Sequence, residues 1–250
     1  MQGLNQETEA NKISIPEKLV NYYKIYDNRI DKIKFVINYI EEKSDHKTIV
    51  FFNTCASVVY YYKLLTTYFK RICKKNIAES IYFCHGEMKQ KKRLKNLEDF
   101  TEAETGVIFV TDVFSRGIDI PTVNWIIQVD CPQDPSAFIH RIGRTARKGM
   151  DGSALVLLLE YEKEYIEYLE MRSIKMLEYS KEEHKEKTFD EKSFDKFHNH
   201  IKEIMFSDKD FMLKGSRAFV SFIRSYKEHK LASIFKFDDI DPRETAKSFF

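Results

Sequence analysis

The chain has 250 residues, of which 41 are Lys or Arg and 39 are Asp or Glu, so its formal net charge is +2. Its 43% hydrophobic and 14% aromatic content, together with few glycines and prolines, excludes collagen-like, low-complexity and wholly disordered proteins. The longest apolar run, 154–159, is far shorter than the ~20 residues that cross a bilayer, and the polar, acidic N-terminus does not resemble a targeting signal. We therefore expect a soluble, intracellular protein with no membrane segment.

The first part of the chain alternates between helical and strand-like patterns. Ile30, Ile33, Ile37 and Ile40 recur at the spacing of a helix, and short apolar runs then alternate with helical stretches. The runs predicted as strands are 49–52, 81–84, 107–110, 125–129 and 154–159. Strands that are apolar throughout are covered on both faces, so we expect an α/β fold with a parallel sheet and helices on both faces. Ligands bind such sheets beyond the carboxyl ends of the strands.

The composition changes after about residue 178. The stretch 180–200 is rich in charge and carries only isolated aromatic residues, Phe189, Phe194 and Phe197, which is typical of a solvated helix or a linker. Beyond it the pattern is helical throughout. One apolar stripe of this region consists of Ala218, Phe219, Phe222, Ile223 and Tyr226. We therefore expect a small all-α extension after the sheet domain.

The last residues predict the start of one more helix. Asp241 is suited to an N-cap, Pro242 to the first helical position and Glu244 to the returning side chain of a capping box. The sequence stops at Phe250, after two or three turns. This ending suggests a truncated chain or a shortened extension.

The four cysteines do not form a metal-binding pattern in the sequence. Cys55, Cys73, Cys84 and Cys131 are separated by 18, 11 and 47 positions, without a Cys-x-x-Cys pair or a neighbouring histidine pair. Structural zinc sites use ligands in closely spaced pairs. We therefore expect buried thiols and no metal.

The segment 138–147 carries the strongest chemical pattern. Asp134 and Pro135 predict a helix that begins at about residue 135, and on that helix His140, Arg144 and Arg147 would form one stripe. Guanidinium groups directed at one point suit a polyphosphate, because their planar donors bind spread negative charge. A solvated basic helix face is the alternative.

The segment 110–121 follows an apolar run and so begins at the carboxyl edge of the predicted sheet. Thr111 and Asp112 would lie at that edge, and Gly117 permits a tight turn. Asp119 is suited to accept a hydrogen bond from a ribose hydroxyl, but it could equally cap the next element.

Together these two segments resemble motifs V (TDVFSRGIDIP) and VI (HRIGRTAR) of the DEAD-box RNA helicases. Residues 49–62 and 85–100 are similar to motif IV and to the family's His-Gly strand end with its Gln-x-x-Arg sequence. The resemblance covers about residues 15–175, the second of the family's two RecA-like domains. Residues 215–241 resemble the helical extension of a subgroup that acts in large-ribosomal-subunit assembly, although a plain amphipathic helix would show the same stripe.

The resemblance implies a RecA-like helicase C-terminal domain over 1–175, a charged helical linker over 176–206 and a helical C-terminal extension over 207–250. The sequence contains no Gly-x-x-x-x-Gly-Lys and no Asp-Glu-Ala-Asp. In the family these motifs belong to the first domain, so ATP would be bound with Mg²⁺ held by that missing domain.

The resemblance also implies roles for individual residues. Arg144 and Arg147 would be catalytic arginine fingers, and His140 would join the network between the domains. The cofactor-binding residues would be Arg116, Gly117 and Asp119. The RNA-binding residues would be Thr111, Asn53, Thr54, Gly86, Gln90 and Arg93. A basic run beside them, either a phosphate-facing patch or the exposed side of a helix, consists of Lys89, Lys91, Lys92, Arg93 and Lys95.

The function expected from the resemblance is the second half of an ATP-dependent RNA helicase, inactive alone, in ribosomal RNA processing. Its expected partners are pre-ribosomal RNA, the N-terminal RecA-like domain and ribosome-assembly proteins. We expect a monomer, and by family resemblance a nuclear, nucleolar location. Two alternatives stay open: a stand-alone, non-catalytic module that binds RNA or protein, and a DNA-directed helicase or translocase with the same core.

Overall fold

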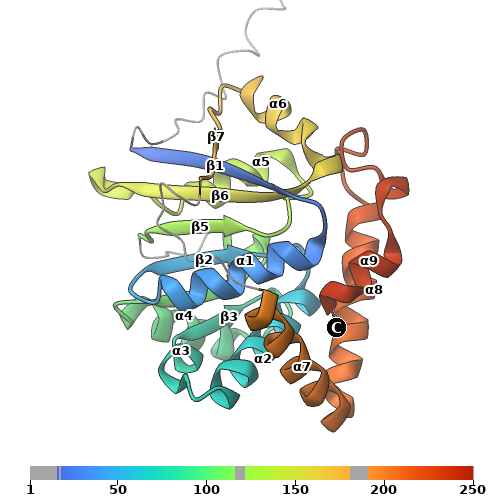
Figure 1. Cartoon of the computed structure of the whole chain (residues 1–250). Coiled ribbons are helices and arrows are strands. Elements are labelled where there is room, and N and C mark those ends of the chain that lie inside the picture. Colours follow the sequence, from blue (N-terminus) through green and yellow to red (C-terminus); the bar gives the residue numbers. More distant parts are fainter. Residues whose placement is uncertain (1–15, 17, 116–121, 181–190, 250) are drawn as a thin grey trace, which may run out of the picture.

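The computed structural model describes residues 16, 18–115, 122–180 and 191–249. Within them, seven parallel strands form one sheet in the order β3-β4-β2-β5-β6-β1-β7 (Figure 1). The strands are β1 (Leu19–Tyr26), β2 (Lys47–Phe51), β3 (Ile81–Cys84), β4 (Gly106–Val110), β5 (Trp125–Gln128), β6 (Gly152–Leu159) and β7 (Leu177–Glu178). The five predicted strands and the parallel sheet are confirmed. The sequence missed β1 because Asn21 and Lys24 interrupt its apolar run, and β7 because it has two residues.

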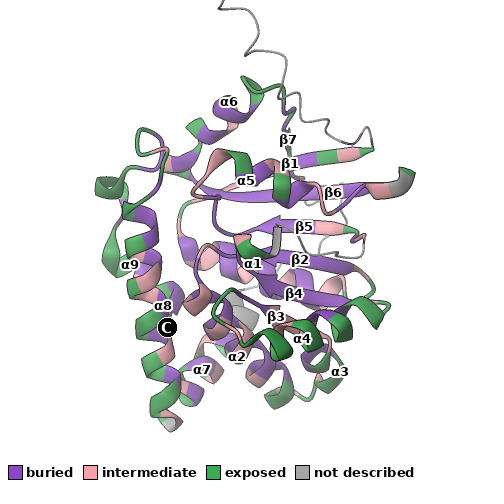
Figure 2. Ribbon diagram, turned by 180° about the vertical axis from the view of Figure 1, so that it is seen from behind, coloured by how far each residue is buried: buried purple, intermediate pink, exposed green. Residues whose placement is uncertain are grey.

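Helices cover both faces of the sheet, as predicted (Figures 1 and 2). The long ones are α1 (Arg29–Glu42), α2 (Cys55–Arg71), α4 (Gln90–Glu102) and α5 (Pro135–Ile142), and two short ones are α3 (Lys75–Glu79) and α6 (Glu164–Glu170). Connections between parallel strands are right-handed, and the strand order therefore places α1 and α2 on one face and α4 and α5 on the other. Every residue of β2 and of β4 is buried, and the sequence is apolar throughout β4 and over the last three residues of β2.

Two buried ion pairs join α1 to the loops that follow β5 and β6. The Arg29 guanidinium donates to the carboxylate of Asp130, and Lys32 Nζ lies 2.9 Å from Glu162 Oε2. All four side chains are buried. A buried charge is tolerated only with its partner, so these pairs fix α1 relative to the carboxyl edge of the sheet.

The C-terminal residues form α7 (Glu191–Ser207), α8 (Lys209–Lys227) and α9 (Pro242–Ala246), and α8 and α9 stand beside one edge of the sheet in Figure 1. The predicted apolar stripe is confirmed, because Ala218, Phe222 and Tyr226 are buried. Hydrogen bonds attach the chain end to α2: Tyr60 Oη donates to the carbonyl of Phe249 at 2.6 Å, and Tyr61 Oη donates to that of Ser248 at 2.9 Å.

The described part of the charge-rich stretch from residue 191 onward belongs to a helix with one packed face, α7, and not to a helix solvated all round. In α7 the side chains of Phe197, Ile201 and Ile204 are buried, and the Phe197 ring meets Tyr68 of α2 edge-on at 4.7 Å between centroids. The acidic and basic residues between them hid this face from sequence reasoning. Phe189 and the side chain of Phe194 lie outside the described residues.

Both predicted N-caps are confirmed. Asp134, which precedes Pro135, accepts a hydrogen bond from the N–H of Ser136, and Asp241 accepts from the N–H groups of Arg243 and Glu244.

Within the described ranges, no helix is both long enough and apolar enough to cross a bilayer.

The junction between the extension and the sheet should be sensitive to acid. The His229 ring, after α8, stacks on Phe235 at 3.9 Å, and burial lowers its pKa from 6.5 to about 4. Between pH 6.5 and about pH 4, His229 binds a proton in the unfolded chain but not in the folded chain. Stability is therefore complete above about pH 6.5 and should fall by up to about 3 kcal/mol as the pH drops toward 4.

Urea unfolding of the chain at about pH 7 and about pH 5 measures this loss. The variant His229→Gln cannot titrate at this position, and we expect a smaller difference between its two stabilities. An equal pH dependence of the two proteins would assign the acid sensitivity to other groups.

Candidate functional site

The loops after β2, β4 and β5 meet at the carboxyl edge of the sheet. The register is level there: Phe51 pairs with Val110 of β4 and with Gln128 of β5. The residues that follow these strands therefore lie side by side. The structure brings together Asn53, Thr54, Thr111, Asp112 and Asp130. Sequence reasoning predicted Thr111 and Asp112 at this edge, and the family resemblance grouped Thr111 with Asn53 and Thr54.

A buried arginine joins these three loops. Arg141 of α5 is fully buried, and Nε and Nη2 donate to the two carboxylate oxygens of Asp112 at 2.5 and 2.8 Å. Nη1 donates to Gln128 Oε1 at 3.2 Å and to the carbonyl of Asp130 at 2.7 Å, and Nη2 donates to Asn53 Oδ1 at 2.9 Å. All five guanidinium N–H donors are thus used. Sequence reasoning missed this residue, although a charge between the apolar positions 139 and 142 was a usable signal.

The side chain of Asn53 is held inside this network. Its backbone N–H donates to Asp130 Oδ2 at 3.1 Å, and its Nδ2 donates to the carbonyl of Cys131 at 2.6 Å. With Oδ1 accepting from Arg141, the geometry favours a positioning role for Asn53. Its direct contact with RNA stays a prediction.

The two threonines at this edge differ in their partners. Thr54 caps α2: its Oγ1 accepts from the N–H of Ser57 at 3.1 Å and lies 2.8 Å from Ser57 Oγ. Thr111 is 5% exposed, and its buried Oγ1 has no hydrogen bond to any described residue. An unsatisfied buried hydroxyl costs about 1–3 kcal/mol. Thr111 is therefore the hydroxyl at this edge that is suited to receive a ligand.

The loop after β3 and the start of α4 carry the remaining predicted RNA contacts. Gly86 is exposed, and a Cβ atom there would lie 3.2 Å from Cγ2 of Val113. Gln90 begins α4, and its side chain accepts from Arg93. The lysines of the basic run are exposed at the N-cap of this helix, Lys89, and along its first turns, Lys91, Lys92 and Lys95. Both earlier readings of the run, a phosphate-facing patch and a solvated helix side, are compatible with this exposure.

Arg144 and Arg147 do not lie on one helical stripe with His140, and this expectation is wrong. The helix α5 ends at Ile142, and Gly143 caps it. The segment then turns, and Thr145 forms a bridge with Val123, ahead of the amino end of β5. The two arginines therefore lie at the opposite end of the strands from Thr111. His140 is exposed on α5, and both arginines are half-buried.

Local backbone geometry fixes the arginine segment. Arg147 Nε donates to the carbonyl of Gly143 at 2.8 Å. Between the arginines, Ala146 has a φ of 54°, in the left-handed region that residues with a Cβ rarely adopt. A Cβ on Gly152 would lie 2.4 Å from the backbone N of Ala146, so only glycine at 152 allows the segment to pack there.

Three predicted cofactor residues cannot be placed. Arg116, Gly117 and Asp119 lie outside the described residues. The spacing of cysteines and histidines in the sequence did not predict a cluster of metal ligands. The structure nevertheless brings Cys55, His85 and Glu87 together beside the predicted RNA edge.

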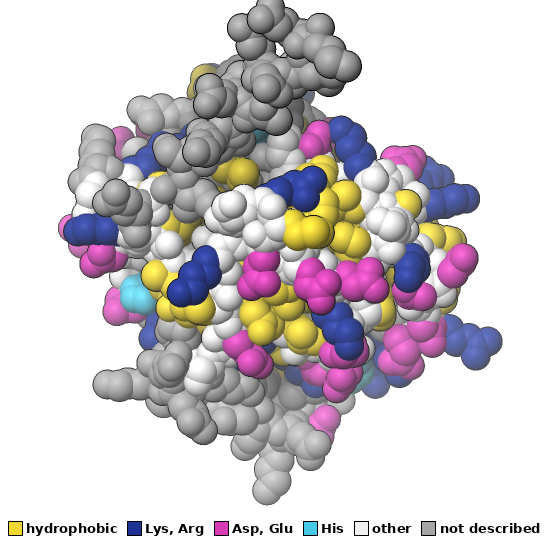
Figure 3. Space-filling model, turned by 90° about the horizontal axis from the view of Figure 1, so that it is seen from above, with side chains coloured by type: hydrophobic (Ala, Val, Ile, Leu, Met, Phe, Trp, Pro, Cys, Tyr) yellow, Lys and Arg dark blue, Asp and Glu magenta, His cyan; other side chains and the backbone are white. Residues whose placement is uncertain are grey.

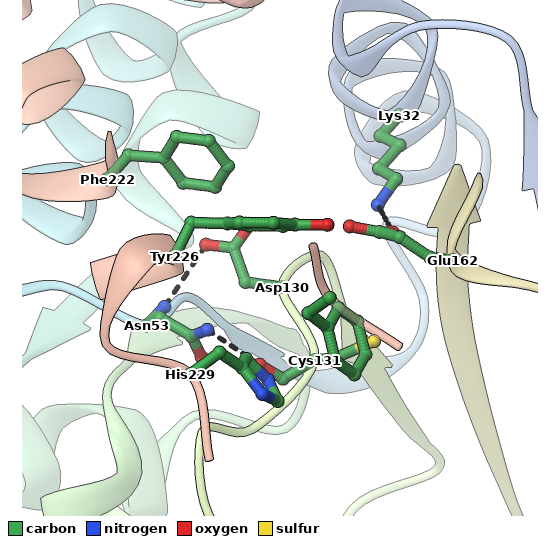
Figure 4. Close-up of a pocket in the computed structure, with 9 residues that line it drawn as sticks. Lys32, Asn53, Asp130, Cys131, Glu162, Phe222, Tyr226 and His229 are labelled. Atoms are coloured by element: carbon green, nitrogen blue, oxygen red, sulfur yellow. Dashed lines mark hydrogen bonds and ion pairs between the residues drawn. The ribbon is translucent and has the colours of Figure 1, made fainter. Parts of the chain in front are cut away.

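The C-terminal extension touches the Arg141 network through Arg29. The Arg29 guanidinium carbon lies 4.0 Å from the ring centre of Phe222 in α8 while the same group pairs with Asp130. Figure 4 shows the pocket at this junction, where Asp130 and Asn53 face side chains of the extension and the Tyr226 hydroxyl points toward Glu162. The extension thus covers the sheet edge at β5 and β6, and sequence reasoning did not foresee this.

Charge on the described surface is mixed. In Figure 3, acidic and basic side chains alternate with apolar ones on the visible described face. This agrees with a net charge of +2 and gives no single-signed field on that face. Any affinity for an anion therefore depends on local groups.

Comparison with known proteins identifies both parts of the chain. Residues 31–149 match the helicase conserved C-terminal domain, and residues 208–250 match the ATP-dependent rRNA helicase SPB4-like C-terminal extension. The probable ATP-dependent RNA helicase ddx55 of Dictyostelium discoideum is 38% identical over 227 residues, which are 90% of this chain and 32% of that protein. The human ATP-dependent RNA helicase DDX55 is 36% identical over 234 residues, 94% of this chain and 36% of that protein.

Solved structures of DEAD-box proteins share the fold. A structure of Mss116p bound to ssRNA and AMP-PNP superposes with a TM-score of 0.66 and 26% identity, over 93% of this chain and 43% of that chain. The chain spans about a third of the length of the two curated relatives. With this sheet, this domain match and this extension, the chain belongs to the DEAD-box RNA helicase family, in which it corresponds to the C-terminal RecA-like domain and the C-terminal extension.

Proposed function

We propose that this chain supplies the second half of an ATP-dependent RNA helicase, with arginine fingers for ATP hydrolysis and half of the RNA-binding cleft. One observation carries the proposal: α5 connects, through buried Arg141, the edge that holds Thr111 with the segment that holds Arg144 and Arg147. A group that binds RNA and a group that acts on a nucleotide are thus built on one rigid frame. Such a frame suits an enzyme that couples the two events.

Arg144 and Arg147 are the proposed fingers. A guanidinium group stabilises the charge that spreads over the transferring phosphoryl group, and such a finger contributes about 10³–10⁵ in rate. This corresponds to roughly 4–7 kcal/mol, far more than the 0–1 kcal/mol of a surface ion pair. His140 would join the contacts between the two domains, and Arg116, Gly117 and Asp119 would contact the nucleotide.

ATP and its Mg²⁺ would be held mainly by another RecA-like domain. The 250 residues contain neither a P-loop nor an Asp-Glu-Ala-Asp sequence. This chain would contribute cationic side chains to the nucleotide, and the metal would supply charge neutralisation at the phosphates. We therefore propose that the chain has no ATPase activity without that domain.

The RNA half-cleft would be the carboxyl edge of β2, β3 and β4. Thr111 offers a hydroxyl that has no partner among the described residues, and Gly86 offers exposed backbone. Thr54, Asn53, Gln90 and Arg93 would complete or position the contacts. Such groups bind phosphate and sugar and not base edges, so binding would be largely independent of sequence and weakened by salt.

The extension supports a role in ribosome biogenesis. Its family model is named for an ATP-dependent rRNA helicase, so we infer pre-ribosomal RNA and ribosome-assembly proteins as partners and the nucleolus as the location. We also propose three parts, 1–175, 176–206 and 207–250, with the second and third packed on the first. The contacts of α7 and α8 with α2 support this division.

The proposed fingers can be tested with the first domain restored to this chain. We expect negligible ATPase from the chain alone and RNA-stimulated ATPase from the two-domain protein. Arg144→Ala and Arg147→Ala should each lower the turnover by about 10³-fold or more, because phosphoryl charge then lacks its donor. Arg243→Ala, at an exposed position of α9, is the control.

Steady-state ATPase with saturating RNA is the measurement. Turnover by the chain alone, or variants as active as the Arg243→Ala control, would contradict the proposal. RNA binding without any ATPase in the two-domain protein would favour the non-catalytic module.

The geometry of the arginine segment gives a separate test. Gly152→Ala places a Cβ against the backbone of Ala146, so the segment must shift and the stability should fall by about 1–3 kcal/mol. In the two-domain protein we expect lower turnover with nearly unchanged RNA affinity, since Thr111 lies at the other end of the strands. The control is Ser153→Ala, at the next position of β6, which adds no atom against the arginine segment. Equal losses of turnover and RNA affinity would oppose this assignment.

The RNA edge can be tested through Thr111. Thr111→Val keeps the side-chain shape and removes the hydroxyl, and we expect weaker binding of single-stranded RNA by the two-domain protein with little loss of folding stability. Thr111→Ser should retain most of the affinity because it keeps the hydroxyl. Fluorescence anisotropy at several salt concentrations measures both. Identical affinities of the Val and Ser variants would exclude a hydroxyl contact.

A further inference from the structure

Three potential metal ligands meet beside the proposed RNA edge. Cys55 is the first residue of α2, His85 directly follows β3, and Glu87 lies two residues further on. One ligand atom from each of the three lies within 4.8 Å of the other two. The thiol is half-buried, the imidazole buried and the carboxylate exposed, so the cluster is accessible from solvent on the carboxylate side.

The histidine is held in place, and its Nδ1 atom has no hydrogen-bond partner among the described residues. His85 is 8% exposed, and its buried Nδ1 has no hydrogen bond to any described residue. Its ring stacks on Phe83 with 6.0 Å between centroids, which limits its rotation. A buried ring nitrogen without a partner is costly to folding, and a bound cation would satisfy it.

The imidazole is also in the form that binds metals. Burial lowers the pKa of His85 below its usual value, with the positive charge of Lys92 acting in the same direction and Glu87 opposing it. The ring is therefore neutral at neutral pH, and a neutral imidazole has a lone pair for a cation.

We propose that Cys55, His85 and Glu87 form a zinc-binding site. Thiolate, imidazole and carboxylate are all ligands of Zn²⁺, whereas Mg²⁺ and Ca²⁺ take oxygen ligands. The Cys55 sulfur binds as the thiolate and its proton passes to solvent, His85 binds through Nδ1, and Glu87 binds through one carboxylate oxygen. Three protein ligands leave the fourth position of a tetrahedral zinc ion open to water.

The three ligands lie next to residues of the proposed RNA edge. Cys55 adjoins Thr54, and Gly86 lies between the two other ligands. The cation would link the start of α2 to the loop after β3, two segments that are joined within the sheet only through β4 and β2. Zinc would therefore stiffen this loop. This inference stands on the three ligands and does not depend on the proposed helicase function.

The test uses the complete 250-residue chain, reduced and freed of metal with a chelator. Zn²⁺ is titrated in competition with a chromophoric chelator, and Co²⁺ serves as the spectroscopic substitute. We expect one ion per chain, a thiolate-to-cobalt charge-transfer band, and release of one proton from the thiol at a pH where it is protonated. Zinc should also raise the thermal unfolding midpoint of the chain.

The variants separate this site from other thiols. Cys55→Ser and His85→Gln should each weaken Zn²⁺ binding by at least about 10-fold, with Glu87→Gln having a smaller effect because the carboxylate is exposed. Cys73→Ser, which changes an exposed thiol elsewhere, is the matched control and should bind as the unchanged chain does.

Circular dichroism shows whether each variant is folded before titration. If His85→Gln does not fold, the decision rests on Cys55→Ser, which is close to isosteric. Absence of the charge-transfer band from the unchanged chain, or equal Zn²⁺ affinity of Cys55→Ser and Cys73→Ser, would overturn the site.

Discussion

The structure depends on one buried guanidinium group. Arg141 is fully buried and uses its five N–H donors on Asp112, Gln128, Asp130 and Asn53. Removing one partner of a buried pair typically costs about 3–5 kcal/mol because the other charge is left uncompensated. The strand ends of β2, β4 and β5 are therefore locked to α5. Groups that would meet RNA and groups that would meet a nucleotide acquire fixed relative positions from this single side chain.

The candidate groups divide between the two ends of the strands. Thr111 and Gly86 lie at the carboxyl edge, whereas Arg144 and Arg147 follow the end of α5, beside the bridge between Thr145 and Val123. A continuous helix would have carried His140, Arg144 and Arg147 along one face. The helix α5 ends at Ile142, and Ala146, with its left-handed backbone, packs against Gly152. The two arginines therefore do not share the helix face that carries His140.

The extension is part of the same framework. Arg29 pairs with Asp130 on one side and contacts Phe222 of α8 on the other, so this residue connects the extension to the Arg141 network. The attraction between a cation and an aromatic ring is stronger when both are removed from water, and Arg29 and Phe222 are both buried. Because the extension covers the edge at β5 and β6, the accessible part of the carboxyl edge is the part formed by β2, β3 and β4.

The amino-acid sequence by itself determined five of the seven described strands, the class of the sheet, the caps at Asp134 and Asp241, and the family, because these follow from local apolar patterns and contiguous motifs. It could not give the end of α5, the buried face of α7, or the meeting of Cys55 with His85. Each of these depends on contacts between residues far apart in the chain. Tertiary structure alone decided which charged side chains are buried, since a guanidinium or an imidazole enters a core only where distant partners converge on it.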